Sequence, residues 1–197
     1  MKRFFDIIMS LFLMVIFLPL IMTIAIVVKI DSRGPVFFIQ KRVGKGGKDF
    51  RMFKFRTMCI DADKKGLLTV GNKDKRITGV GYFLRKYKLD ELPQLFNVLN
   101  GTMSMVGPRP EVRKYVELYD SRQKKVLDVL PGITDMASLI YINENELLAK
   151  SPDPEEMYVS EIMPAKLELN LSYLANRTLW SDFNIILKTF LKSFFRK

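Results

Sequence analysis

The sequence contains no histidine, and its single cysteine is Cys59. Without histidine, neither a Ser-His-Asp triad nor a Cys-His pair can be assembled from this chain. The nitrogen and sulfur ligands of an ordinary structural zinc site are missing as well, and one cysteine excludes an intrachain disulfide. The chemistry that remains open uses carboxylates, lysine, arginine, hydroxyls, backbone amides and an oxygen-ligated hard cation.

Acidic residues are few relative to basic ones, 21 against 32, so the formal net charge is +11. A chain this basic is expected to meet phosphate in nucleic acid, on an anionic membrane surface, or in a nucleotide or lipid. Hydrophobic residues make up 48% of the chain and aromatic residues 12%, which argues against disorder. A length of 197 residues suits one modest domain with an accessory segment.

Charged residues are absent from residues 7–28, a mostly apolar run of 22. As a helix, this run would be about 33 Å long, close to the hydrocarbon thickness of a bilayer. A single transmembrane helix is the simplest interpretation. A cleaved signal peptide and a buried helix of a soluble protein fit less well, because the run is long and apolar on every face.

Two features of this run favour a different membrane topology. Pro19 lies near its middle, where it removes a helical hydrogen bond and forces a kink. Basic residues flank both ends, and the positive-inside rule places both flanks in the cytoplasm. These flanking residues are Lys2, Arg3, Lys29, Arg33, Lys41 and Arg42. We therefore expect residues 1–33 to form a re-entrant helical hairpin kinked at Pro19.

Residues 183–197 carry four basic residues and no acidic one. Their apolar residues recur at helical spacing: Ile186, Leu187, Phe190, Leu191, Phe194 and Phe195. A basic amphipathic helix with aromatic residues is typical of an interfacial helix on anionic lipid. A terminal helix packed on its own domain is the alternative.

Two short strands are predicted at residues 36–39 and 50–56, joined by a glycine-rich turn at residues 44–48. The turn matches neither the Walker spacing nor the dinucleotide fingerprint. Phenylalanine alternates with basic residues in the second strand, as in platforms for single-stranded nucleic acid. A half-buried strand with one wet, basic face is the alternative.

The pair Asp90–Glu91 directly precedes a predicted helix over residues 92–99. Pro93 suits the first turn of this helix, and Asn100–Gly101 suits its end. The two carboxylates would then lie at a helix N-terminus, where free amides and the helix dipole favour anions. Simple capping is one interpretation of such a pair.

The surroundings of the pair favour a chemical role. Arg85, Lys86 and Lys88 crowd the two carboxylates and would keep them ionised. Ionised carboxylates can act as nucleophiles or bind magnesium through oxygen. Shortly afterwards, Arg109 stands between two prolines and follows a glycine, which would hold its guanidinium rigidly against a phosphate. An exposed arginine on a plain loop is the alternative.

Nine short motifs follow one another along the chain: KRFFD (2–6), GPVFF (34–38), QKRVG (40–44), KFRTM (54–58), LDELPQ (89–94), NVL (97–99), MS (103–104), VGPRP (106–110) and PGIT (131–134). In order and spacing, this set resembles the bacterial sugar transferases, the small monotopic phosphoglycosyl transferases, over residues 1 to about 134. The ordered set is far more specific than any one motif.

The resemblance implies transfer of a sugar 1-phosphate from a UDP-sugar to polyprenol (undecaprenyl) phosphate, with release of UMP. This is the first membrane step of surface glycan assembly. Asp90 inherits the role of the nucleophile, which attacks the β-phosphate and forms a sugar-phosphoryl aspartate in a two-step, ping-pong scheme. The family requires Mg²⁺, which Asp90 and Glu91 would help to hold. Glu91 is expected to act as proton acceptor or metal partner.

The resemblance also assigns phosphate contacts or site support to four basic residues: Arg85, Arg109, Lys54 and Arg56. It implies a compact, α-rich α/β domain at residues 34–182, between the re-entrant helix and the interfacial helix at 183–197. It further implies a monotopic enzyme on the cytoplasmic face of the bacterial inner membrane. The expected partners are a UDP-sugar, polyprenol phosphate and phospholipid, with no nucleic acid and with a homodimer left open.

The chain departs from the family pattern at several positions. Leu18 stands before Pro19 where serine is usual, and Thr102 replaces a common aspartate. After the PGIT motif, the usual Gly-Trp-Ala-Gln is replaced by DMAS (135–138), and the basic residue that often follows is absent. The identity of the sugar therefore does not carry over from the family. A non-catalytic membrane adaptor that binds anionic lipid is the alternative function.

Overall fold

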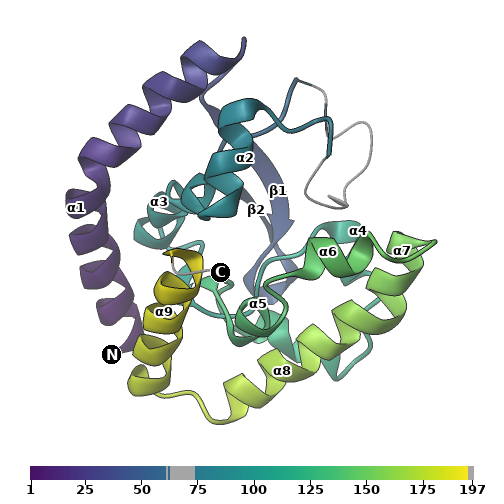
Figure 1. Ribbon diagram of the computed structural model, residues 1–197. Helices are drawn as coiled ribbons and strands as arrows, with labels where there is room; N and C mark the ends of the chain where they lie inside the picture. Colours follow the sequence, from purple (N-terminus) through teal and green to yellow (C-terminus); the bar gives the residue numbers. More distant parts are fainter. Residues whose placement is uncertain (61, 63–73, 195–197) are drawn as a thin grey trace.

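The computed structural model describes residues 1–60, 62 and 74–194, and helices dominate this part of the chain (Figure 1). The strands are β1 (Phe37–Val43), β2 (Asp49–Phe55), β3 (Ser104–Val106) and β4 (Gly132–Thr134). The α-helices are α1 (Lys2–Asp31), α2 (Gly79–Lys86), α3 (Gln94–Leu99), α4 (Arg113–Val116), α5 (Met136–Ile140), α6 (Glu144–Leu148), α7 (Pro154–Met157), α8 (Met163–Ala175) and α9 (Leu179–Phe194). Short 3-10 turns are η1 (Lys45–Gly47), η3 (Leu89–Glu91) and η4 (Gln123–Asp128), and η5 (Tyr158–Ile162) is a π-helical turn. The expected helix-rich α/β class is confirmed.

The apolar helix α1 runs as one continuous helix through Pro19, along a curved course around one side of the molecule (Figure 1). Proline removes one main-chain donor from these 30 residues, and the Thr23 hydroxyl donates to the Pro19 carbonyl at 2.9 Å. Both halves of α1 pack on the same domain, through Met9 and Leu13 in the first half and Ile24 in the second. The structure therefore does not confirm the expected re-entrant hairpin, which stays a prediction.

The beginning of α1 is fastened to distant parts of the chain. Arg3 donates to the carbonyls of Val98 and Leu99, at 2.6 and 3.1 Å, where α3 ends. The buried carboxylate of Asp6 accepts from the Ser104 hydroxyl at 2.9 Å and from the Met105 amide at 3.1 Å. The KRFFD motif thus joins α1 to α3 and β3.

The strands β1 and β2 form the predicted antiparallel hairpin, in which Phe38 pairs with Lys54 and Gln40 with Met52. Its turn contains Gly46 and Gly47, whose φ angles of +67° and +71° lie in the left-handed region that favours glycine. Because side chains alternate along a strand and partners across a ladder share a face, Gln40, Arg42 and Lys54 point to one face of the hairpin.

The parallel strands β3 and β4 approach each other closely at two glycines. A Cβ atom on Gly132 would lie 2.1 Å from the Gly107 nitrogen, so no larger residue fits there without a backbone shift. The Gly107 amide donates to Thr134 at 3.1 Å, and the Gly132 amide donates to Pro108 at 3.0 Å. These bonds fix the start of the loop that carries Arg109.

The helix α9 begins at Leu179, four residues before the predicted segment 183–197, because a reciprocal cap starts it there. The Ser181 amide donates to the Thr178 hydroxyl at 3.0 Å, and the Thr178 amide donates to the Ser181 hydroxyl at 2.9 Å. Ile185 is buried against the domain. The part of the prediction that concerns Phe195, Arg196 and Lys197 lies outside the described residues.

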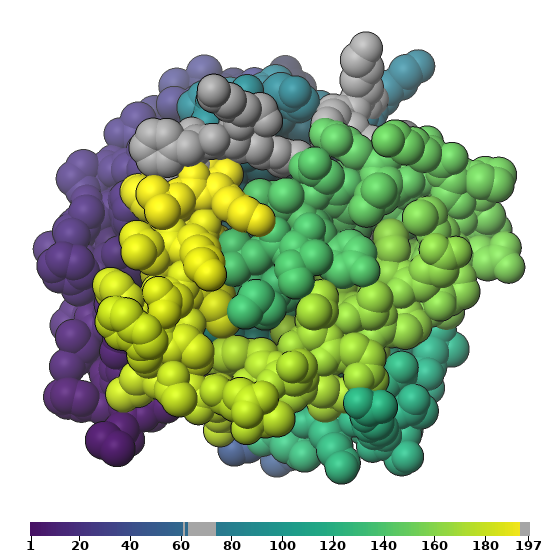
Figure 2. Space-filling model, turned by 60° about the horizontal axis from the view of Figure 1, so that its bottom comes forward, coloured from purple at the N-terminus to yellow at the C-terminus, as the bar shows by residue number. Residues whose placement is uncertain are grey.

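Figure 2 shows α9 beside α1, and both helices expose many large apolar side chains. The exposed side chains on α9 are Leu179, Trp180, Phe183, Leu187, Phe190 and Leu191. The exposed side chains on α1 include Phe4, Ile8, Leu11, Phe12, Val15, Ile16, Leu18, Met22, Ile26 and Ile30. By length and composition, α1 is also able to cross a bilayer. The helix α9 packs on its own domain, as one of the two expectations for residues 183–197 stated. Its interfacial position on anionic lipid stays a prediction.

Candidate active site

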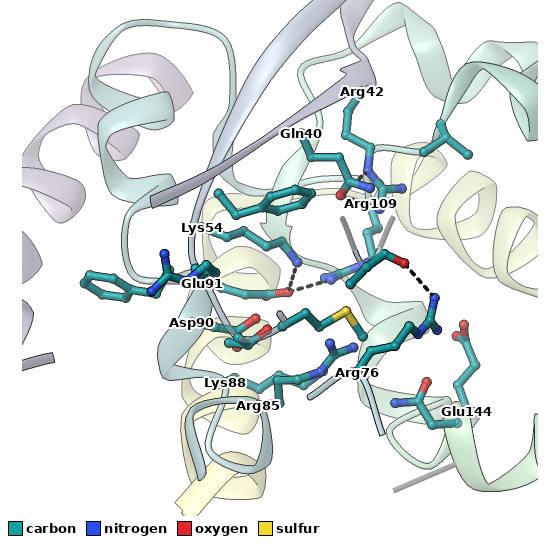
Figure 3. A pocket seen from close by; sticks show the side chains of 18 of the residues that line it. Gln40, Arg42, Lys54, Arg76, Arg85, Lys88, Asp90, Glu91, Arg109 and Glu144 are labelled. Atoms are coloured by element: carbon teal, nitrogen blue, oxygen red, sulfur yellow. Dashed lines mark hydrogen bonds and ion pairs between the residues drawn. The ribbon is translucent and has the colours of Figure 1, made fainter. Parts of the chain in front are cut away.

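A pocket of about 440 Å³ opens between the β1–β2 hairpin, the turn η3, the loop after β3 and the helices α5 and α6 (Figure 3). Two of the buried apolar clusters meet here, since Phe55 of one and Leu148 and Tyr158 of another line the pocket. Among the described lining residues, eight are lysine or arginine and four are carboxylates. This excess of positive charge favours a ligand that carries phosphate.

The turn η3 brings Asp90 and Glu91 to this pocket immediately before α3. The preceding residue, Lys88, has a φ of +58°, a left-handed conformation that is uncommon for a residue with a side chain. Such strain is frequent at functional sites, where the surrounding structure imposes it. The pair lies where the sequence placed it, although in a separate 3-10 turn rather than in the helix itself.

The carboxylate of Glu91 is clamped by two cations from distant segments. Lys54 Nζ of β2 donates to Glu91 Oε1 at 2.9 Å, and Arg109 Nη2 donates to the same oxygen at 2.5 Å (Figure 3). Burial alone would raise the pKa of Glu91, but Arg109 and Lys54 hold this pKa well below its usual range. Glu91 is therefore ionised at neutral pH, and the charge of Glu91 in turn raises the pKa of Arg109.

Asp90 has different surroundings. Its side chain is buried, and its Oδ1 atom has no hydrogen-bond partner. Burial raises the pKa of Asp90; Lys54 opposes this effect, and the adjacent charge of Glu91 adds to it. The side chain of Arg85 lies on the other side of Asp90 from Glu91 in Figure 3, and burial lowers the pKa of Arg85. An unpartnered carboxylate oxygen beside several cations is suited to attack an electrophile or to bind a hard cation.

The fit of a magnesium ion rests on that unpartnered oxygen. Among the described residues, no three carboxylate, histidine or cysteine side chains lie close enough together to bind one metal ion. A magnesium site formed by protein side chains alone is therefore absent from the described part of the chain. Magnesium is commonly bound by one or two carboxylates, with water and substrate phosphate completing its octahedron. Asp90 meets that requirement, whereas Oε1 of Glu91 is already taken by two cations.

The sequence pattern of the bacterial sugar transferases matches residues 1–196. The chain belongs to this family. It is 38% identical over 191 residues to the UDP-N-acetylgalactosamine-undecaprenyl-phosphate N-acetylgalactosaminephosphotransferase of Aeromonas hydrophila, a match that covers 95% of this chain and 42% of the relative. It is 38% identical over 200 residues to the UDP-glucose:undecaprenyl-phosphate glucose-1-phosphate transferase of Klebsiella pneumoniae, covering 100% and 40%.

A sugar transferase of Bacillus subtilis is 36% identical over 192 residues, which cover 98% of this chain and 86% of the relative. The chain thus spans about two fifths of the length of the Aeromonas and Klebsiella proteins and most of the length of this third one. The recognised family is confirmed.

The structure brings most of the predicted site residues together. Lys54, Arg85 and Arg109 all line the pocket that holds Asp90 and Glu91. Arg56 also borders the pocket, but its guanidinium turns toward the end of α1. It donates to the carbonyls of Val28, Ser32 and Pro35 at 3.1, 2.7 and 2.5 Å, and also to the Ser32 hydroxyl at 2.9 Å. Arg56 therefore supports the end of α1 in this structure.

Sequence reasoning did not assign Gln40, Arg42, Glu111 or Tyr158, which also line the pocket. The Tyr158 hydroxyl donates to Glu111 at 2.8 Å, and Arg42 donates to Gln40 and to Glu111. A signal for two of them was present, because Gln40 and Arg42 alternate within the QKRVG motif and so share a face of β1. Glu111 and Tyr158 are joined to them only through the fold.

The departure at residues 135–138 has a structural role on the far side of the pocket. Asp135 is fully buried, and it caps α5 by accepting from the Ser138 amide at 2.8 Å. Its second oxygen accepts from Asn170 of α8 at 2.9 Å. Ser138 also lines the pocket that holds Asp90, so this unusual segment forms part of the pocket wall.

Proposed function

We propose that this protein transfers a sugar 1-phosphate from a UDP-sugar to polyprenol phosphate. The observation that carries the proposal is the buried, unpartnered oxygen of Asp90 beside a Glu91 that Lys54 and Arg109 hold ionised. Membership of the bacterial sugar transferase family supports the same reaction, because its relatives are named for UDP-sugars and undecaprenyl phosphate.

In the first step, a carboxylate oxygen of Asp90 attacks the β-phosphorus of the UDP-sugar. The bond between this phosphorus and the oxygen that bridges the two phosphates breaks, and UMP leaves with the electron pair. A sugar-phosphoryl group then remains on Asp90. Phosphoryl transfer depends mainly on positioning and charge neutralisation, and Lys54, Arg85 and Arg109 supply positive charge around the reacting group.

In the second step, a phosphate oxygen of polyprenol phosphate attacks the same phosphorus. The bond to Asp90 breaks, the carboxylate is regenerated, and polyprenyl diphosphate-sugar is released. This product would begin the assembly of a surface glycan. Neither step needs histidine, in agreement with the composition.

Asp90 would hold a magnesium ion together with the diphosphate and water, and Glu91, whose Oε1 is occupied by Lys54 and Arg109, would have only its second oxygen to offer. When bound, the ion would offset the negative charge that develops on the phosphate oxygens during transfer. Glu91 keeps Lys54 and Arg109 beside that charge, which is a positioning role in addition to any proton transfer.

We further propose that the apolar surface of α1 and α9 lies against the cytoplasmic leaflet of the inner membrane. Trp180 is 71% exposed, and aromatic rings at such positions favour the membrane interface. Lys188 is exposed on the same helix, where it can meet anionic headgroups. This arrangement would bring the polyprenol phosphate headgroup and a cytosolic UDP-sugar to one protein. A re-entrant course for α1 and a homodimer stay predictions.

The test uses the full-length protein in detergent or nanodiscs, with UDP-glucose and UDP-N-acetylgalactosamine as donors, undecaprenyl phosphate as acceptor and Mg²⁺ present. We expect UMP release and lipid-linked sugar from at least one donor, and a sugar-phosphoryl label on the protein when the acceptor is omitted. Asp90→Asn should abolish all three signals. Asp128→Asn, at an exposed position, is the matched control and should leave them unchanged.

The alternative function, a membrane adaptor that binds anionic lipid, makes the opposite prediction. It requires normal vesicle binding and no UMP release from the wild type with any UDP-sugar. Retained lipid-linked product in the Asp90→Asn protein would instead contradict the covalent mechanism.

A further inference from the structure

Residues 107–111, called the Arg109 arm from here on, bring Arg109 to Glu91. The main chain of this arm is held at both ends. Before Arg109, the pairing of β3 with β4 immobilises Gly107 and Pro108. After Arg109, the main chain at Glu111 accepts from the Val43 amide of β1 at 2.8 Å. The position of the Arg109 guanidinium therefore depends on what holds the two residues that follow it.

Arg42 contacts both of those residues. Its Nη1 atom donates to the Pro110 carbonyl at 3.2 Å and to Glu111 Oε2 at 3.3 Å. Its Nε and Nη2 atoms both donate to Gln40 Oε1, at 3.0 and 2.9 Å. The planar guanidinium thus bridges a side chain of its own strand and the end of the Arg109 arm, which a single ammonium group is unable to do.

Glu111, which accepts from Arg42, is itself held by two further hydrogen bonds. Glu111 Oε1 accepts from the Tyr158 hydroxyl at 2.8 Å, and Glu111 Oε2 accepts from the Val112 amide at 3.0 Å. Tyr158 is only 2% exposed, and its ring packs against Tyr115 with a centroid distance of 5.0 Å. Figure 3 shows Arg42 and Gln40 together above Arg109, on the side of the pocket away from Asp90.

We propose that Arg42 is a positioning residue that acts through Arg109: by bridging Gln40 to Pro110 and Glu111, it holds the Arg109 guanidinium against Glu91 and the donor diphosphate. This inference rests on the proposed function for its substrate. Direct contact between Arg42 and a phosphate is the competing explanation, since Arg42 also lines the pocket. The two explanations differ in whether the effect of Arg42 survives the loss of Arg109.

A double-mutant cycle separates them, because two residues that act as one unit give effects that do not multiply. The four proteins are wild type, Arg42→Met, Arg109→Met and the double variant, measured for UMP release with the donor found active. We expect kcat/KM to fall about 10-fold for Arg42→Met and about 100-fold for Arg109→Met. In the Arg109→Met background, Arg42→Met should change kcat/KM by less than about 3-fold. Independent, multiplying effects, or no effect of Arg42→Met alone, would overturn the proposal.

Conservative variants test the bridge itself. Arg42→Lys keeps the charge but loses the fork, so its kcat/KM should stay within about 3-fold of that of Arg42→Met. Full rescue by lysine would show that charge alone matters and would overturn the bridging role. Tyr158→Phe, which removes only the hydroxyl behind Glu111, should lower kcat/KM less than Arg42→Met does. Arg113→Met, at an exposed arginine that contacts the same hairpin through Gly47 and Asp49, is the matched control and should change nothing.

The same four proteins are also measured for UDP binding by calorimetry. If the wild type releases no UMP with any donor, the proposed function fails, and the UDP cycle still decides the positioning role. Binding losses that do not multiply support the role of Arg42, and binding losses that multiply refute it. Melting curves on each protein confirm that it is folded.

Discussion

Asp90 and Glu91 are neighbours in one 3-10 turn, yet their pKa values move in opposite directions. Glu91 points between Lys54 and Arg109, which hold its pKa well below the ordinary value. Asp90 lies buried with one oxygen unpartnered, so its pKa is raised, and the negative charge of Glu91 adds to the rise. Glu91 therefore stays ionised and holds Lys54 and Arg109 in place. Asp90, whose pKa is raised, gains a proton more readily as the pH falls.

The first prediction concerns the pH profile. A carboxylate with a raised pKa loses its proton only at higher pH, so the acid limb of kcat/KM should lie above the ordinary Asp value of about 3.8. Lys88 lowers the pKa of Asp90, so Lys88→Gln should move the limb to still higher pH. Lys88→Arg keeps the charge in the same left-handed conformation and should leave the limb in place. A limb that moves to lower pH in Lys88→Gln would contradict this account.

The second prediction concerns the two cations that Glu91 neutralises. Glu91→Gln leaves Lys54 and Arg109 without their carboxylate, and we expect the free energy of unfolding to fall by about 3 kcal/mol. Chemical denaturation in detergent measures the change. The Lys54→Met/Glu91→Gln protein should lose less than the sum of the single losses, because only one unpaired cation remains. Glu117→Gln, at an exposed site, serves as control. If the Glu91→Gln protein were as stable as wild type, the contacts of Glu91 with Lys54 and Arg109 would contribute little to stability.

The third prediction separates Arg56 from the other basic residues of the pocket. Because both terminal nitrogens of Arg56 donate at the end of α1, Arg56→Met should reduce the free energy of unfolding by about 2–4 kcal/mol. The kcat/KM of the folded protein should stay near the wild-type value. Arg85→Met should do the reverse, with lower kcat/KM and a nearly unchanged melting temperature. An Arg56→Met protein that melts normally but turns over poorly would restore Arg56 to the substrate site.

The fourth prediction concerns the fastening of α1 at Asp6. Asp6→Ala leaves the buried Met105 amide without its acceptor. The Ser104 hydroxyl loses its bond to Asp6 and keeps only the Val106 carbonyl, at 3.0 Å. We expect a loss of about 3 kcal/mol, against about 1 kcal/mol for Ser104→Ala, which removes one donor only. Asp31→Ala, at the exposed other end of α1, is the control and should have little effect. Equal melting of the Asp6→Ala and Asp31→Ala proteins would refute the fastening.

Local patterns predicted the features of the fold that depend on near neighbours. The β1–β2 hairpin follows from alternating residues around a glycine turn, and the end of α3 at Leu99 follows from the Asn100–Gly101 stop. Asp90 and Glu91 were found for the same reason, since a dense group of charges before a proline is visible within six residues.

Long-range pairings account for what sequence reasoning missed. Nothing near Arg56 in the sequence indicates that its donors meet carbonyls more than 20 residues earlier. Likewise, Glu111 and Tyr158 are 47 residues apart and meet only when η5 packs against the Arg109 arm. The start of α9 was visible but overlooked, because the reciprocal cap of Thr178 and Ser181 is a local signal.

The fastening of α1 also has a consequence for the timing of synthesis. Arg3 and Asp6 find their partners 95 to 99 residues later, and Lys2 Nζ contacts Asp182 at 2.6 Å, 180 residues along the chain. At the usual speed of translation, α1 waits roughly 8–30 s after its own synthesis before its last partner, Asp182, exists. During the first part of that interval, before α3 and β3 are made, its apolar side chains have no domain to pack against. Contact of α1 with a bilayer is therefore expected to come before the pocket around Asp90 is complete.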